Sequence, residues 1–260
     1  MINSKIFDYI DPIIFSIGSF DIKWYAIAYI AGILLGEYYT NYLVKKFTLP
    51  INKIQIQGFL TWLILGIILG GRLGYVIFYN PIEYFNNPIE ILKTWEGGLS
   101  FHGAVIGVVI STIIFSRIKK LSFLLLLDLI STSAPIGIFF GRCANFINQE
   151  LVGRVTDSPL GIIFPGYNEP RHPSQLYEAL FEGLILFCIM FISTFRYKSI
   201  LNRGLNSGIA MFCYGIFRIA IENFRDPDTQ LGFIFSNITM GQLQTIPLLI
   251  VGIFMIYRFK

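Results

Sequence analysis

Long apolar stretches recur along the chain and are separated by shorter polar segments. Each stretch is close to the roughly 20 residues that a helix needs to cross about 30 Å of hydrocarbon. The pattern therefore predicts an all-α integral membrane protein with seven transmembrane helices, forming a single transmembrane domain over residues 1–260. The predicted spans are 24–44, 58–78, 99–116, 121–140, 176–195, 208–224 and 240–257.

Composition supports the membrane assignment. Hydrophobic residues make up 54% of the chain, and charged residues only 14%, against about 25% in soluble domains. That is too little charge to cover the surface of a soluble protein. Intrinsic disorder is also excluded, because disordered chains have low hydrophobicity and high charge. The three cysteines have no CxxC spacing, so we expect neither a disulfide framework nor a metal site. A phosphate-loop or nucleotide-binding fingerprint is also missing from the sequence, and we expect no nucleic-acid partner.

The charges of the connecting segments divide into two alternating sets. One set contains eleven basic residues and no acidic ones: Lys45, Lys46, Lys53, Arg117, Lys119, Lys120, Arg196, Lys198, Arg203, Arg258 and Lys260. The other set mixes both signs. The positive-inside rule places the basic set in the cytoplasm, which predicts an N-terminus outside and a C-terminus inside. The longest outer segment, at about 141–175, is the first place to look for a site, because long loops are often functional.

Several charged residues lie inside the predicted spans, mostly toward their outer ends. Burying a charge at the bilayer centre costs between about 3 and about 15 kcal/mol, so such residues usually mark function. Tyr214, Arg218 and Glu222 are spaced by four and share one helix stripe. This stripe predicts either a self-neutralising Arg218–Glu222 pair or an arginine held ready for an anion.

A second polar stripe contains Arg142, Asn145 and Asn148, spaced by three. A guanidinium beside two amides suits phosphate or ester oxygens. The alternative is a helix end whose carbonyls bond to polar side chains. His102, between glycines near the start of span three, is either a general base or a structural histidine.

Two further groups have structural explanations that compete with functional ones. Ser174 is a plausible N-cap for span five, with Gln175, Glu178 and Glu182 on one face below it. This face is either a polar stripe that points into the helix bundle for structural reasons or a set of catalytic residues. Asp128 in span four needs a partner, and a structural partner is favoured. Together these charges suggest an anionic headgroup on an apolar tail, as in a lipid-processing enzyme or a carrier of lipids or anions.

Four blocks of residues then resemble a known family. They are Gly-Gly-Leu-Ser-Phe-His102-Gly, Gly-Arg142-x-x-Asn145-Phe-x-Asn148-x-Glu150-x-x-Gly153-Arg154, Arg171-His172-Pro-Ser-Gln-Leu-Tyr-Glu178 and Tyr214-Gly-x-x-Arg218-x-x-x-Glu222. In order and spacing they resemble the prolipoprotein diacylglyceryl transferases over essentially the whole chain. Ala144 and Ala104 depart from the family pattern, where glycine is usual, and both changes are small.

The resemblance implies a membrane enzyme without a cofactor at the outer face of the bacterial inner membrane. It would transfer the diacylglyceryl group of phosphatidylglycerol to the lipobox cysteine of a preprolipoprotein signal peptide, making a thioether and glycerol-1-phosphate. By this resemblance, Arg142 and Arg218 would clamp the phosphate, and Glu150 and Glu222 would orient these arginines. His102 would be the candidate base for the thiol, and Tyr25 a further catalytic residue. The implied substrate contacts also include Asn145, Gly153 and Tyr214.

Two other classes compete with the enzyme. A lipid or anion carrier predicts opposed broken helices and internal symmetry, which the sequence does not indicate. A structural scaffold would not need Arg142, His102 and Arg218 to face one outer cavity. Arginine-assisted formation of the thiolate is the alternative to His102 as the base.

Overall fold

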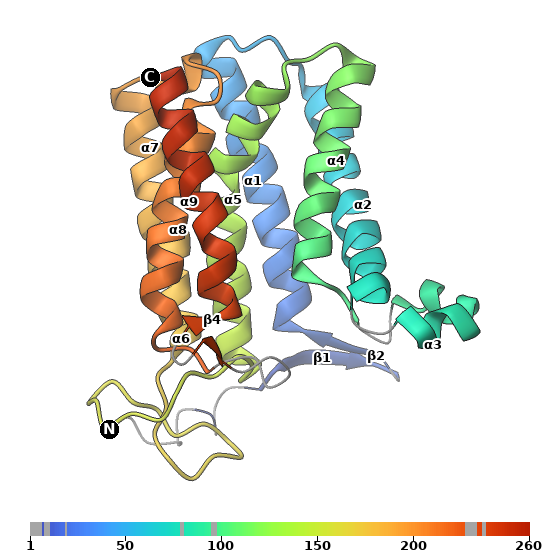
Figure 1. Cartoon of the computed structure of the whole chain (residues 1–260), viewed down its shortest axis with the longest axis vertical. Helices are drawn as coiled ribbons and strands as arrows, with labels where there is room; N and C mark the ends of the chain where they lie inside the picture. Colours follow the sequence, from blue (N-terminus) through green and yellow to red (C-terminus); the bar gives the residue numbers. More distant parts are fainter. Residues whose placement is uncertain are drawn as a thin grey trace. The chain divides into compact units, whose positions relative to one another are not determined.

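The computed structural model describes residues 7, 11–18, 20–78, 81–94, 98–226, 233–235 and 238–260. Most of these residues are helical (Figure 1). By its internal contacts the chain divides into two compact units. Unit 1 comprises Met1–Tyr39 and Asp128–Lys260, and unit 2 comprises Thr40–Leu127. Each unit is described by itself.

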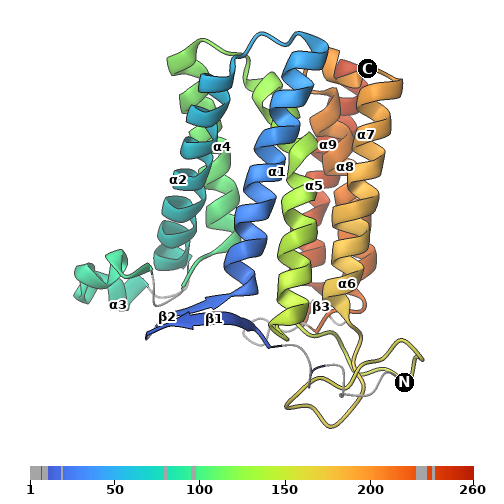
Figure 2. The same ribbon diagram turned by 180° about the vertical axis from the view of Figure 1, so that it is seen from behind.

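Unit 1 is built mainly from long helices. They are α5 (Phe123–Ile147), a continuous helical run of α6 (Ser174–Glu178), η4 (Ala179–Ile185) and α7 (Leu186–Arg196), then α8 (Leu205–Glu222) and α9 (Met240–Phe259). Most of α1 (Trp24–Phe47) and all but the first turn of α5 belong to this unit. Helix α8 packs against both α7 and α9 (Figures 1 and 2). Gly252 permits the α8–α9 approach, since an added Cβ would lie 2.8 Å from the Phe212 amide nitrogen.

Short strands and a long loop complete unit 1. Strands β1 (Ile13–Ile17) and β2 (Phe20–Lys23) form an antiparallel pair just before α1, and β3 (Phe233–Phe235) pairs with β4 (Ile238–Thr239) just before α9. The loop after α5 has its own small apolar core, in which Val152, Ile162 and Phe164 pack with Phe7. Helix α5 continues to Ile147, so residues 141–147 of the predicted outer loop are helical.

Unit 2 contains α2 (Lys53–Phe78), α3 (Pro81–Asn86), the 3₁₀ helix η2 (Pro88–Leu92), α4 (Phe101–Lys119) and the short 3₁₀ turn at 94. Glycines bring α2 and α4 into backbone contact: an added Cβ at Gly103 would lie 2.2 Å from the Gly70 carbonyl oxygen. Buried Arg72 donates to the backbone carbonyls of Ile91 (2.9 Å), Glu90 (2.5 Å) and Gly98 (3.2 Å). Through these three hydrogen bonds, Arg72 holds the segment that follows α2 against α2 itself.

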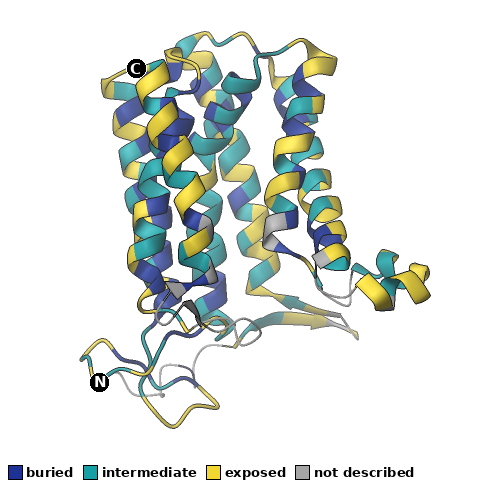
Figure 3. Cartoon of the chain, in the orientation of Figure 1, coloured by how far each residue is buried: buried dark blue, intermediate teal, exposed yellow. Residues whose placement is uncertain are grey.

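Four helical segments among the described residues are long and apolar enough to cross a membrane: Lys53–Ile77, Phe123–Ile147, Ser174–Arg196 and Gly241–Phe259. Many large apolar side chains on the helices are exposed (Figure 3), including Leu69, Ile250 and Phe254. Exposed apolar helix surface is expected where the solvent is lipid. The protein is therefore a mostly helical membrane protein, while the count of seven spans, the orientation of the termini and the single domain stay predictions.

Candidate active site

Six charged side chains gather in unit 1 where α5, α6, η4 and α8 meet. We call this group the ionic cluster; its members are Arg142, Glu178, Glu182, Arg218, Glu222 and Arg225. The three carboxylates are buried, with exposures of 1% for Glu178, 0% for Glu182 and 5% for Glu222. Charges are this deeply buried in proteins only where they are paired or have a function.

Glu178 is the centre of the cluster. Its Oε2 lies 3.0 Å from Nε of Arg142, and its Oε1 accepts from Nη1 of both Arg218 and Arg225 at 2.9 Å. One carboxylate therefore fixes three guanidinium groups from α5, α8 and the segment after α8. Hydrogen bonds between charged partners are the strong ones, so Glu178 determines where all three positive charges lie.

Arg218 bridges two carboxylates. Its Nη1 donates to Glu178, and its Nη2 lies 2.9 Å from Oε2 of Glu222, four residues later on α8. Glu222 is held in turn by the Thr239 hydroxyl, which donates to Oε1 at 2.9 Å. The predicted Arg218–Glu222 pair is thus present, but it is part of a larger network and does not simply neutralise itself.

Close helix packing brings α5 to this network. An added Cβ at Gly183 would lie 2.8 Å from the Cα of Phe139, so η4 can approach α5 closely only because residue 183 has no side chain. Arg142 lies one turn after Phe139 on α5, and Glu178 lies on the helical run that carries Gly183. The glycine therefore permits the Arg142–Glu178 contact.

Amide side chains extend the cluster along the end of α5. Arg142 Nη1 donates to Asn145 Oδ1 at 3.5 Å, and Asn145 Nδ2 donates to Glu150 Oε2 at 3.3 Å. Asn148 donates to the other Glu150 oxygen at 3.4 Å, and Gln175 donates to the Glu150 backbone carbonyl. Glu150 is thus linked to Arg142 through the side chain of Asn145.

Gly153 allows three segments to converge beside the cluster. A Cβ at this position would lie 2.5 Å from the backbone oxygens of both His172 and Phe224, so no side chain fits. Arg154 then donates from Nε to the Arg225 carbonyl at 2.7 Å, and Gly153 forms a β-bridge with Arg225. In this way the loop after α5 holds Arg225 in place next to Glu178.

Three aromatic residues lie near the cluster. The hydroxyls of Tyr25 and Tyr29 are 2.7 Å apart, and Tyr29 interacts electrostatically with Arg142 and Glu150. Tyr214 lies one turn before Arg218 on α8 and interacts electrostatically with Arg218 and Glu182. Tyr25 is therefore hydrogen-bonded to Tyr29, and Tyr214 lies one helical turn from Arg218 on α8.

Two histidines were singled out by the sequence motifs. His102 lies in the first turn of α4, where the N-cap Ser100 accepts from the Gly103 amide at 3.2 Å. Its side chain is outside the described part of the chain, so its role stays a prediction. His172, in the loop before α6, has its pKa lowered by burial, and its Nδ1 lies 3.1 Å from the Tyr177 hydroxyl.

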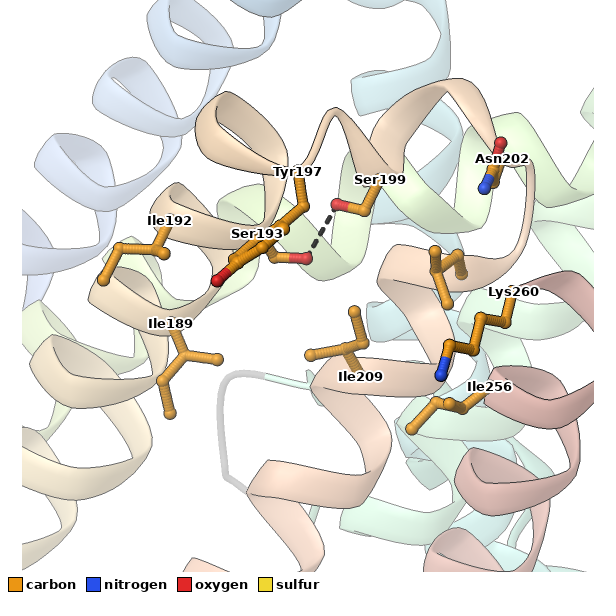
Figure 4. A pocket seen from close by; sticks show the side chains of 10 residues that line it. Ile189, Ile192, Ser193, Tyr197, Ser199, Asn202, Ile209, Ile256 and Lys260 are labelled. Atoms are coloured by element: carbon orange, nitrogen blue, oxygen red, sulfur yellow. Dashed lines mark hydrogen bonds between the residues drawn. The ribbon is translucent and has the colours of Figure 1, made fainter.

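A cavity of about 580 Å³ lies elsewhere in unit 1 and contains none of the predicted site residues (Figure 4). Its walls come from α7, α8, α9 and the turn at 197–202, and four of its ten lining residues are isoleucines. Among the described residues, no group of His, Cys, Asp and Glu has the arrangement to hold a metal ion. The chemistry-bearing groups of unit 1 are instead those of the ionic cluster.

The structure brings together Arg142, Asn145, Glu150, Arg218 and Glu222 of the predicted site. Sequence reasoning did not assign the central role of Glu178, nor the participation of Arg225. A signal was available, because three arginines at or just beyond the ends of apolar helices need carboxylate partners when they are buried. Glu178 and Glu182 are the carboxylates inside span five.

Comparison with known proteins agrees with the sequence motifs. Residues 12–258 match the family model described as prolipoprotein diacylglyceryl transferase. Relatives named phosphatidylglycerol--prolipoprotein diacylglyceryl transferase occur in Rickettsia typhi (57% identical over 250 residues, covering 96% of each chain) and Rickettsia canadensis (55% over 248 residues, 95% of this chain and 96% of the relative). The relative of that name from Rickettsia bellii is 54% identical over 253 residues, 97% of this chain and 96% of its own length. The chain is therefore an enzyme that belongs to the prolipoprotein diacylglyceryl transferase family.

Proposed function

We propose that this protein transfers the diacylglyceryl group of phosphatidylglycerol to the lipobox cysteine of prolipoproteins. The products are a thioether-linked lipid on the cysteine and glycerol-1-phosphate. The names of the relatives give the two substrates. The observation that carries the proposal is the position of Arg142, Arg218 and Arg225 around the single carboxylate of Glu178.

The reaction develops negative charge on the phosphate group and therefore needs positive charge close to it. The substrate sulfur attacks the glyceryl carbon that carries the phosphate ester, so a C–S bond forms as the C–O bond breaks. The electron pair of the broken bond stays on the phosphate, which changes from a singly charged diester to a more highly charged monoester. Donors placed where this charge develops lower the barrier, and Arg142 and Arg218 are proposed to bind the phosphate.

The carboxylates of the cluster keep these arginines in position. Three arginines and three glutamates are formally neutral together, which limits the cost of burying them. Each guanidinium has five N–H donors in a planar fork. An arginine bound to Glu178 or Glu222 can therefore bind phosphate oxygens as well, with no need to reorganise during the reaction.

The substrate thiol must lose its proton. Its reference pKa of about 8.5 leaves little thiolate at neutral pH, and His102 is the proposed base. Stabilisation of the thiolate by the arginines alone is the alternative. A His102→Asn variant distinguishes them: a base contributes about 10²- to 10⁴-fold, whereas near-normal turnover would assign thiolate formation to the arginines.

The proposed setting is the bacterial inner membrane, with seven spans and the ionic cluster toward the outer face. The all-basic segments support this orientation by the positive-inside rule. Single cysteines placed in a background without Cys143, Cys188 and Cys213 can test it in intact cells. A membrane-impermeant maleimide should label Asp157→Cys from outside, and should label Lys198→Cys only after the membrane is opened; the reverse pattern would overturn the orientation.

A direct assay tests the activity. Purified protein in detergent is incubated with phosphatidylglycerol and a lipobox peptide, and the mass of the peptide is measured by mass spectrometry. The proposal predicts a peptide heavier by one diacylglyceryl group, no such product with a serine-for-cysteine peptide, and equimolar release of glycerol phosphate. Folded protein that makes no product would refute the proposal, and lipid movement between vesicles without product would favour a carrier.

A further inference from the structure

Glu182 differs from the other carboxylates of the ionic cluster. Its side chain is completely buried, yet neither of its oxygens accepts a hydrogen bond from any described residue. The nearest ion-pair contact in the structure joins its Oε1 to Arg218 Nη1 at 3.7 Å. By contrast, Glu178 and Glu222 each lie 3.0 Å or less from an arginine nitrogen.

The backbone at this position is also unusual. Glu182 lies in η4, a π-helical segment between the α-helical segments α6 and α7. Short π-helical turns inside α-helices are rare and occur frequently at functional sites. Here the irregular turn carries Glu182, four residues after Glu178, so both carboxylates reach the same guanidinium of Arg218.

A buried acceptor without a donor is costly. Most buried polar side-chain atoms in proteins have a hydrogen-bond partner, and a burial without one costs several kcal/mol. Two such oxygens on one side chain, beside arginines that are proposed to bind a phosphate, indicate that the missing donors belong to the substrate. Those donors must lie next to the phosphate, because Arg218 contacts both groups.

We propose that Glu182 accepts hydrogen bonds from the hydroxyls of the glycerol headgroup of the lipid substrate. This inference rests on the proposed function, since phosphatidylglycerol carries two free hydroxyls on the glycerol that is esterified to its phosphate. With the phosphate on Arg218, the neighbouring glycerol can reach a carboxylate 3.7 Å from that guanidinium. Glu182 then selects the headgroup and holds the leaving glycerol phosphate.

The same contact would select against other headgroups. A choline or propyl headgroup has no hydroxyl or N–H donor and would leave Glu182 unpaired. A site built to bind a hydroxyl rejects analogues that lack it far more strongly than an apolar pocket rejects a small change in size. An ethanolamine headgroup does carry donors, but it would bring a positive charge next to Arg218 and close to two further arginines.

The test combines one substitution with one change of headgroup. Turnover of phosphatidylglycerol and of phosphatidylpropanol, which lacks both headgroup hydroxyls, is measured with the wild type and with Glu182→Gln. We expect the wild type to prefer phosphatidylglycerol by about 100-fold or more in kcat/KM. Glu182→Gln should lower kcat/KM for phosphatidylglycerol by about 10- to 100-fold more than it lowers kcat/KM for phosphatidylpropanol, so that the preference for the hydroxylated headgroup shrinks.

The other outcomes are equally definite. An equal loss on both lipids would mean that Glu182 only supports the structure, and equal wild-type turnover of both lipids would overturn the proposal without any variant. The wild-type comparison therefore decides the matter if Glu182→Gln does not fold. A wild type that uses neither lipid would refute the proposed function itself, and with it this inference.

Discussion

Unit 1 contains two buried polar networks, and they differ in how completely their groups are paired. The ionic cluster surrounds Arg142 near the end of α5. The second network surrounds Asp128 near the start of the same helix, about 21 Å away at 1.5 Å per residue. Asp128 and Glu182 are both 0% exposed, so burial alone does not separate a structural carboxylate from one that is proposed to bind substrate.

Asp128 is fully paired. Its oxygens accept from the amide nitrogens of Gly204 (2.6 Å) and Ser207 (2.8 Å) and from the Ser207 hydroxyl (2.7 Å). These amides belong to the first turn of α8, where a negative charge also interacts favourably with the helix dipole. Asp128 thus caps α8 from a neighbouring helix, and the prediction of a structural partner for it is confirmed.

Neutral side chains complete the Asp128 network. Asn206 donates to Thr132 (3.1 Å) and Thr194 (2.9 Å), and it also accepts from Ser199. Every one of these contacts joins groups within the protein. In the ionic cluster, by contrast, neither oxygen of Glu182 accepts a hydrogen bond from a described residue. The charged side chains of this cluster also do not cap a helix end, as Asp128 does. The two networks therefore differ in how completely their groups are paired and not in how deeply they are buried.

The largest expected effect comes from Arg218, which contacts three of the carboxylates. Arg218→Lys keeps the positive charge but removes the planar fork that bridges Glu178 and Glu222. We expect kcat/KM for phosphatidylglycerol to fall by about 10²- to 10³-fold. Arg196→Lys, an exposed arginine at the end of α7, is the matched control. Similar turnover by both variants would remove Arg218 from the proposed phosphate site.

The next prediction makes the same chemical change in both networks. Glu178→Gln should lower turnover per folded molecule by about 100-fold, because three arginines lose their common partner. Asp128→Asn should leave turnover per folded molecule unchanged but lower the stability by about 2 to 3 kcal/mol, since an amide places donors opposite the amides of α8. Mass-spectrometric assay and thermal unfolding in detergent measure the two quantities. An Asp128→Asn protein that is stable but inactive would contradict the distinction.

A smaller effect is expected within the neutral part of the Asp128 network. Asn206→Ala removes the hydrogen bonds to Thr132, Thr194 and Ser199, and we expect a loss of about 1 to 3 kcal/mol in the free energy of unfolding with normal turnover. Ser199→Ala should cost less, because fewer groups lose a partner. A loss of turnover at unchanged stability in either variant would show that this network also serves the reaction.

The smallest effect concerns His172, outside the proposed spans. Burial lowers its pKa in the folded protein, so the neutral ring is favoured there. Its contribution to stability is therefore complete above the unfolded-state pKa of about 6.5 and is lost as the pH falls through the folded-state pKa. His172→Gln should flatten this part of the profile of unfolding free energy against pH. An unchanged profile would mean that other groups cause it.

Sequence reasoning identified the local parts of the site. Arg142 with Asn145, and Arg218 with Glu222, lie three or four positions apart, so helix periodicity alone places each pair together. Both contacts are present. The predicted outer segment at about 141–175 overlaps the end of α5, which continues in helical geometry to Ile147, because polar side chains mark the end of an apolar run and not the end of the helix.

The remaining parts depend on the tertiary arrangement. Glu178 lies 36 positions from Arg142 and 40 from Arg218, as their residue numbers show, so no periodicity connects them. The π-helical turn that carries Glu182 has no sequence signature of its own. Gly153 was assigned to the site by resemblance, and its physical role emerges only from the two carbonyl groups that approach it.

A structure of the protein with phosphatidylglycerol bound would show directly whether the ionic cluster binds the phosphate. We expect phosphate oxygens to lie about 2.7 to 2.9 Å from guanidinium nitrogens of Arg142 and Arg218, the usual distance for charged pairs. We also expect Glu178 to remain in contact with at least one of these arginines. A lipid whose phosphate lies away from both arginines, with the ionic cluster unchanged, would contradict the assignment of this cluster as the active site.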